Sequence, residues 1–309
     1  MQLEKWHALG NDYLIVEQRA LPFALAPAVV RMLCDRHEGI GSDGVVLIEP
    51  PRERATVAHL RIFNPDGSEA ELSGNGVRQA LIYIRRRGLA AHDAFSVTTA
   101  AGEIRARITG PETCSMDIGR VRLASDAYPS GARDGRGELV AAGRSWRFQF
   151  VDVGNPQCAI EVGEELESLD LAEVGSAIEN APLFPNRTNV SFWRRLDERT
   201  IRARIWERGV GETRSSGTGA TGAAVAAVLR GVDSPVRVVL DGGELQVDIG
   251  EDLHVDLHGW ARPLFRAELS DDFRQRLWRA ASQRGEDGVD ARTDARDGTP
   301  ETGQEVKGR

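Results

Sequence analysis

The chain carries two serines at matching places in two glycine-rich turns. The turns run from Ser73 to Gly76 (SGNG) and from Ser216 to Gly219 (SGTG), lie 143 residues apart (216 − 73), and each opens an apolar helical stretch. The first amides of a helix have no partner within the helix, so they favour a bound anion. Serine also caps helices very commonly, and the spacing alone leaves that simpler role open.

Other pairs of residues repeat at nearly the same offset. Gly-Asn occurs at 10–11 and again at 154–155, and Gly-Glu occurs at 102–103 and again at 243–244. Such a repeat predicts two similar halves. If the halves face each other, both helix N-termini can converge on one ligand, which indicates a carboxylate-binding cleft.

Amides and charges surround the two turns. Asparagines stand at turns or strand ends, and a Glu-Arg pair precedes the second turn; these residues are Asn11, Asn64, Asn155, Asn189, Glu207 and Arg208. Such a mixture of donors and acceptors suits an amino-acid zwitterion. The alternatives stay open: one asparagine alone is more often a turn former, and the Glu-Arg pair alone is an ordinary surface ion pair.

The elements that must position these residues are mostly strands. Alternating or β-branched runs lie at 45–48, 58–63, 95–99, 103–108, 146–153, 190–193, 200–206, 236–240 and 245–249. Helical patterns lie at 26–34, 77–87 and 220–229, and the last is small and apolar on every side, as in a helix enclosed by sheet. The sequence therefore predicts an α+β fold with two pseudo-symmetric halves, each a strand-rich, barrel-like sheet around a central helix.

We place the first half at residues 1–117 plus 263–284 and the second at 118–262. Residues 270–284 are predicted to form an appended amphipathic helix. Its apolar face, directed at the rest of the protein, is expected to carry Phe273, Leu277, Trp278 and Ala281. Residues 285–309 are expected to form a disordered tail, because they are mostly charged or polar and contain no aromatic residue.

Composition limits the partners. The net charge is −8 and no basic face is contiguous, which argues against nucleic acid and membrane and favours a small-molecule amino-acid substrate. Three cysteines without metal spacing predict no disulfide and no metal site. With no apolar run near the roughly 20 residues of a membrane span and no signal peptide, we expect a cytoplasmic protein without a cofactor; a homodimer is left open.

Six segments of the chain resemble diaminopimelate epimerases, in order and spacing. They read HALGNDYLIVE (7–17), DRHEGIGSDGVVLI (35–48), FNPDGSEAELSGNGVRQA (63–80), VGNP (153–156), RTNVSF (187–192) and WERGVGETRSSGTGATGAA (206–224). The resemblance runs to about residue 269 and implies the family's two-domain pseudo-symmetric fold. It also implies a cofactor-independent isomerase that inverts one α-carbon of a diamino diacid, on the route to lysine and cell-wall precursors.

The chain departs from the family at its catalytic positions. Both family turns begin with cysteine, one thiolate removing the α-proton while the opposite thiol returns one, but this chain has Ser73 and Ser216. The family's histidine after Gly-Asn-Pro is Gln157 here. Our candidate catalytic residues are Ser73 and Ser216, which occupy the family's cysteine positions, and Glu207, which could assist Ser216. The positions that the resemblance implies for substrate binding are retained: Asn11, Asn64, Gly74, Asn75, Asn155, Asn189, Glu207, Arg208, Gly217 and Thr218.

Replacing a thiol by a hydroxyl greatly raises the free energy needed to form the basic anion. A thiol ionises near pH 8.5, whereas a serine hydroxyl is close to water's roughly 15.7, so the alkoxide is about 9 kcal/mol harder to form. The amides at a helix N-terminus stabilise a nearby anion by only about 1 to 2 kcal/mol, which offsets a small part of that cost. Three hypotheses follow: a slow epimerase in which Glu207 or a water assists Ser216, a related isomerase or lyase with a more acidic substrate, and a non-catalytic amino-acid-binding paralogue.

Overall fold

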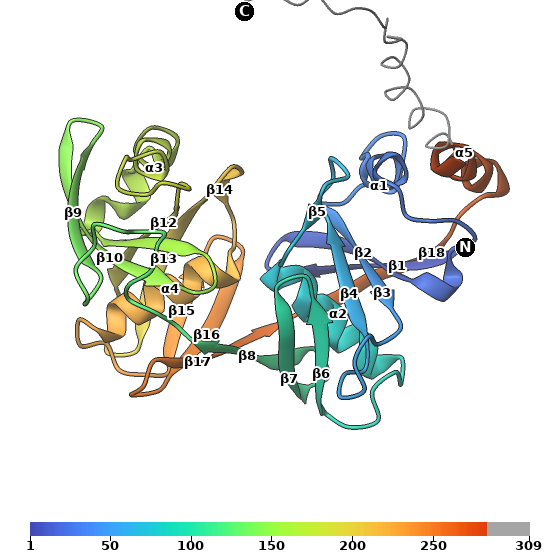
Figure 1. The fold of residues 1–309 in the computed structure, drawn as a ribbon, viewed down its shortest axis with the longest axis horizontal. Helices are drawn as coiled ribbons and strands as arrows, with labels where there is room; N and C mark the ends of the chain where they lie inside the picture. Colours follow the sequence, from blue (N-terminus) through green and yellow to red (C-terminus); the bar gives the residue numbers. More distant parts are fainter. Residues whose placement is uncertain (283–309) are drawn as a thin grey trace, which may run out of the picture.

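The computed structural model describes residues 1–282. Two strand-rich lobes lie side by side, each with one helix running through its interior (Figure 1). The first lobe contains β1 (Gln2–Ala8), β2 (Asn11–Glu17), β3 (Gly44–Glu49), β4 (His59–Phe63), β5 (Glu69–Ala70), β6 (Ala94–Thr99), β7 (Gly102–Gly110), β8 (Thr113–Arg120) and β18 (Arg262–Glu268). The second contains β9 (Arg136–Ala141), β10 (Arg144–Asp152), β11 (Pro156–Glu161), β12 (Asn189–Arg195), β13 (Thr200–Glu207), β14 (Gly211–Thr213), β15 (Val236–Leu240), β16 (Gly243–Ile249) and β17 (His254–Trp260).

The strand pairing is the same in both lobes. In the first, β2 pairs parallel with β3 and β4 pairs parallel with β6, whereas the other neighbours are antiparallel. In the second, β11 pairs parallel with β12 and β13 pairs parallel with β15. The outer partner of β1 is β18, from the far end of the chain, and the outer partner of β10 is β9. This repeated topology confirms the predicted α+β fold of two similar halves.

Two long strands join the lobes. β8 and β17 pair antiparallel with each other, while β8 also pairs with β7 and β17 with β16. The sheet therefore continues from one lobe to the other (Figure 1). The domain boundary that we place after residue 117 falls inside β8 and stays a proposal.

The central helices are α2 (Gly74–Arg86) and α4 (Gly217–Val228). Both confirm sequence-predicted helices, each beginning three residues earlier than expected, at the glycine after the serine. In α4 the alanines from Ala220 to Ala227 have no exposed surface, and the helix packs against seven strands of its lobe, from β10 to β13 and from β15 to β17. Small side chains on every side let the sheet approach the helix closely from all directions.

Three further helices lie outside the lobes' interiors: α1 (Pro27–Cys34), α3 (Leu171–Glu179) and α5 (Asp271–Ser282). The 3-10 turns η1 (Gln18–Ala20) and η2 (Glu164–Ser168) are short. The structure adds α3, which the sequence patterns missed; its buried Leu171, Val174 and Ile178 pack in the core of the second lobe. No helix within residues 1–282 is both long and apolar enough to cross a membrane.

The appended helix α5 packs beside α1 (Figure 1), and its Leu277 is fully buried in the core that the two helices share. Phe273 and Ala281 pack against the same core, as predicted. The prediction for Trp278 is wrong, because 57% of this side chain is exposed. Phe273 and Ala281 lie four residues to either side of Leu277 and share its face, whereas Trp278 lies one residue on and points about 100° away. The predicted tail at 285–309 lies outside the described residues.

Candidate functional site

The two serine turns meet between the lobes. A Cβ built on Gly74 would lie 3.5 Å from the Cα of Gly217, so the N-termini of α2 and α4 are in van der Waals contact. Only residues without a side chain allow two backbones to approach so closely. The repeat predicted this convergence, and it directs the unpaired amides of both helices toward one region.

Each serine caps its helix. The Ser73 Oγ accepts a hydrogen bond from the Gly76 amide at 3.1 Å, and the Ser216 Oγ accepts one from the Gly219 amide at 3.2 Å. The simpler structural role is therefore present in both turns. This capping role is compatible with proton transfer by the same serine, because a hydroxyl that accepts from an amide still carries its own hydrogen for another acceptor.

Ser216 has a carboxylate beside it. Glu207 ends β13, and its carboxylate lies close enough to the Ser216 side chain for Ser216 to lower its pKa. Burial raises the pKa of Glu207 above its ordinary value, and the neighbouring Ser216 and Thr213 side chains oppose that rise only in part. A carboxylate with a raised pKa beside a hydroxyl is a chemically suitable proton acceptor.

Ser73 has a phenol beside it instead. The Tyr13 hydroxyl donates to the Ser73 Oγ at 3.1 Å, and the ring is almost fully buried. Burial raises the pKa of Tyr13 to about 12, the hydrogen bond with Ser73 opposes this, and the charges of Asp43 and Glu207 add to it. Tyr13 was not among the site residues predicted from the sequence. The available signal was its place on β2, where alternation puts it on the same face as Asn11.

Asn75 links the lobes. Its Nδ2 donates to the Ser215 Oγ at 3.0 Å, and its Oδ1 accepts from the Arg78 Nη1 at 3.0 Å. Arg78 is fully buried, and its Nε and Nη2 have no hydrogen-bond partner among the described residues. Burial without a carboxylate lowers its pKa to about 10, so the cation persists at neutral pH. A positive charge therefore lies directly behind the two helix N-termini.

The asparagines of the second lobe are held by neighbours. Asn155 donates to the Thr218 hydroxyl at 3.4 Å and accepts from Gln157 at 2.6 Å. Asn189 donates to a β11 backbone carbonyl at 3.0 Å and accepts from the Arg208 amide at 2.9 Å. Gln157 thus orients Asn155 toward the second turn, and Asn189 fixes the start of the Arg208 loop.

The asparagines of the first lobe are held within that lobe. Asn11 donates to the Asp43 carboxylate at 2.9 Å, and Asp43 pairs with Arg36 at 2.6 Å. Gly10, which precedes Asn11, lies against Arg214 near the second turn. A Cβ on Gly10 would be 3.5 Å from the Arg214 guanidinium. Asn64 donates to Ser68 at 3.0 Å within the β4–β5 turn, and this contact does not bring it to the serines.

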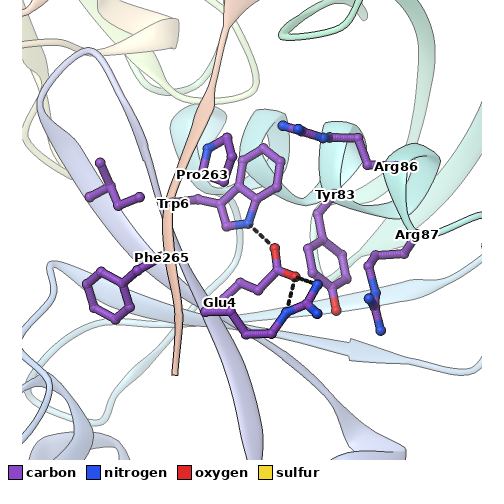
Figure 2. A pocket seen from close by; sticks show the side chains of 9 residues that line it. Glu4, Trp6, Tyr83, Arg86, Arg87, Pro263 and Phe265 are labelled. Carbon is purple, nitrogen blue, oxygen red and sulfur yellow. Dashed lines mark hydrogen bonds and ion pairs between the residues drawn. The ribbon is translucent and has the colours of Figure 1, made fainter. Parts of the chain in front are cut away.

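One surface pocket lies away from the two turns. It has a volume of about 430 Å³ and is lined by residues of β1, α2 and β18, none of them predicted site residues. There the Trp6 indole donates to Glu4, whose carboxylate also pairs with Arg266 (Figure 2). The candidate site is therefore defined by the meeting turns and their proton-carrying neighbours.

Solved structures with this fold include several isomerases. A probable proline racemase from Agrobacterium radiobacter superposes with a TM-score of 0.64 at 16% identity, covering 88% of this chain and 93% of that one. A methylitaconate-delta-isomerase superposes with a TM-score of 0.62 at 13% identity, covering 89% of this chain and 97% of that one. At such identities the likeness shows the fold alone, a two-lobed architecture shared with racemases and isomerases.

The sequence comparisons are more specific. The family model described as diaminopimelate epimerase matches residues 4–124 and 149–259. A diaminopimelate epimerase from Magnetococcus marinus is 40% identical over 86% of this chain and 95% of its own length. A diaminopimelate epimerase from Desulforudis audaxviator is 41% identical over 82% of this chain and 92% of its own length. The chain belongs to the diaminopimelate epimerase family and is an isomerase of that type.

Proposed function

We propose that this protein inverts one α-carbon of LL-diaminopimelate to give the meso isomer, without a cofactor, as a cytoplasmic step of lysine biosynthesis. The observation that carries the proposal is the contact between Gly74 and Gly217, because it places a hydroxyl and a helix N-terminus from each lobe around one region. Inversion requires a proton donor and a proton acceptor on opposite faces of one carbon. Two pseudo-symmetric turns supply groups of that kind from two sides.

The substrate's reacting carboxylate would bind the amides after the two serines. Helix N-termini favour that charge, and they favour it more as the α-carbon loses its proton and negative charge spreads into the carboxylate. The Arg78 cation behind the turns acts in the same direction. Asn155, Asn189 and Arg208 would then recognise the amino and distal groups, with Asn11 and Asn64 on the other lobe.

Glu207 makes a serine usable as a base. If Ser216 takes the α-proton while passing its own to Glu207, no free alkoxide forms, and the process ends on a carboxylic acid of raised pKa. This addresses the barrier of about 9 kcal/mol that an isolated serine would face. We therefore assign catalysis to Ser73, Ser216 and Glu207, at a rate below that of a thiol-bearing relative.

A non-catalytic amino-acid-binding protein is the second candidate. It is favoured by the capping bonds, which give both serines a structural role. A related isomerase or lyase acting on a more acidic substrate is the third candidate, since a hydroxyl and a carboxylate would then suffice.

The test is conversion of LL-diaminopimelate to the meso isomer, followed by chiral separation. We expect slow conversion by the natural chain and faster conversion by the double variant Ser73→Cys with Ser216→Cys, because a thiol is about 7 pKa units more acidic than the hydroxyl. Adding Gln157→His should raise the rate again. Tight binding with no conversion by any of these variants would favour the binding protein.

A further inference from the structure

The structure gives the two serines different partners, a carboxylate at Ser216 and a phenol at Ser73. We propose that Tyr13 is the proton source of the first turn: it donates to Ser73 while Ser73 protonates the α-carbon. The inference rests on the proposed epimerase function. It makes the two turns chemically unequal, with Ser216 and Glu207 accepting a proton where Ser73 and Tyr13 donate one.

The hydrogen bonds at Ser73 set the direction of donation. Its oxygen accepts from the Gly76 amide at 3.1 Å and from the Tyr13 hydroxyl at 3.1 Å. Both acceptor positions of the oxygen are thereby used, so the hydrogen of Ser73 is left to point at a third group. A substrate carbon held beside Gly74 would receive that hydrogen.

The Tyr13 ring is fixed in place by its surroundings. Tyr13 is 5% exposed and pairs across the parallel β2–β3 ladder with Gly44. A Cβ on Gly44 would lie 2.5 Å from the Tyr13 Cε1, so glycine leaves the space that the ring occupies. A hydroxyl on a ring held in this way stays aligned with Ser73, as a relay requires.

The proton transfers balance over the two faces. On one face the Cα–H bond breaks, the proton goes to the Ser216 Oγ, and the proton of Ser216 goes to Glu207. On the other face the Ser73 O–H bond breaks, its proton bonds to Cα, and Tyr13 replaces it, leaving a phenolate. One proton has then moved from Tyr13 to Glu207 overall, and exchange with solvent after product release restores both groups.

The phenol is the more acidic member of its pair. Its pKa is about 12 in this site, against roughly 15.7 for a hydroxyl like that of water. Drawing the proton from Tyr13 through Ser73 therefore leaves a phenolate where Ser73 alone would leave an alkoxide. The nearby Glu207 charge, which raises the pKa of Tyr13, is neutralised when Glu207 takes a proton, so removal on one face assists donation on the other.

The test is a double-mutant cycle between Tyr13→Phe and Ser73→Cys, with conversion of LL-diaminopimelate as the readout. Tyr13→Phe removes the hydroxyl and keeps the ring, so we expect kcat to fall at least tenfold with KM changed less than threefold. In the Ser73→Cys background the same change should cost less than twofold, because a thiol carries its own acidic proton. In deuterium oxide, one configuration should still exchange its α-proton with retention in the Tyr13→Phe variant.

Tyr83→Phe is the matched control. Tyr83 is equally buried in the same lobe and donates to Glu17 at 2.8 Å, away from both turns, so its loss should leave kcat unchanged. A Tyr13→Phe variant with kcat within twofold of the natural chain would overturn the relay while leaving the epimerase proposal intact. Equal losses in both backgrounds would also overturn it, since they would assign Tyr13 a structural role. Binding without conversion or exchange by the natural chain would overturn both proposals.

Discussion

At the scale of residues, the site consists of two similar hydroxyls in unlike surroundings. Ser216 lies beside a carboxylate, whereas Ser73 accepts a hydrogen bond from a phenol, although both cap their helices in the same way. A serine is too weak an acid to exchange protons with carbon alone. The neighbouring ionisable groups therefore decide what each turn can do.

Glu207→Gln should separate activity from stability. We expect conversion of diaminopimelate to fall at least about 100-fold, within the range typical of a lost general base. The pKa of Glu207 is raised in the folded protein, so its contribution favours folding below its ordinary pKa and is lost as pH rises through the folded value. At pH 7 the uncharged glutamine should therefore stabilise the protein against denaturant.

The pH profile and a control complete that experiment. Activity of the natural chain should fall with acid at a pH above that of an ordinary glutamate, because protonation removes the base. Glu244→Gln is the matched control, since Glu244 pairs with Arg237 at the surface at 3.6 Å, and it should change neither property much. A fully active Glu207→Gln variant would exclude Glu207 as the base.

At the scale of elements, the central helices position the site, whereas the appended helix contributes only packing. α2 and α4 hold the serine turns at their first residues, so their position in the sheets sets the geometry of the site. α5 touches neither turn and packs on α1. We therefore expect changes in α5 to affect stability and leave the chemistry alone.

Leu277→Ala tests the packing of α5. Leu277 is fully buried, so the substitution should cost about 2 to 5 kcal/mol of unfolding free energy, measured by chemical denaturation. Trp278→Ala, next to it and 57% exposed, should cost well under half as much. The assignment of the buried face would be contradicted if the tryptophan change proved the more damaging.

Sequence patterns predicted these elements unevenly. Both central helices were predictable because glycine turns and apolar runs are local features. Trp278 was misplaced because apolar character does not tell which side of a short helix faces the body. The signal for α3 was present but not used, because Leu171, Val174 and Ile178 stand at helical spacing after the N-cap residue Asp170. Tyr13 was missed because its role depends on Ser73, a neighbour that only the tertiary structure provides.

At the scale of the whole molecule, the site exists because the two lobes are set against each other. β8 and β17 pair across the junction, the Asn75 amide donates to Ser215, and the glycines of the two turns touch. The internal repeat predicted two similar lobes and convergent helix N-termini. The pairing of β8 with β17 comes from residues outside the repeated turns, so the repeat did not indicate that one continuous sheet would join the lobes.

The most direct test of the account is exchange of the substrate α-proton with solvent. LL-diaminopimelate is incubated with the natural chain in deuterium oxide, and the α-proton signal is followed by NMR beside the Glu207→Gln variant and a sample without protein. We predict slow loss of the signal with the natural chain, with deuterium appearing in the meso isomer, and almost no loss with the variant. A natural chain that binds diaminopimelate yet exchanges no α-proton beyond the protein-free sample would contradict the claim that these serines transfer protons.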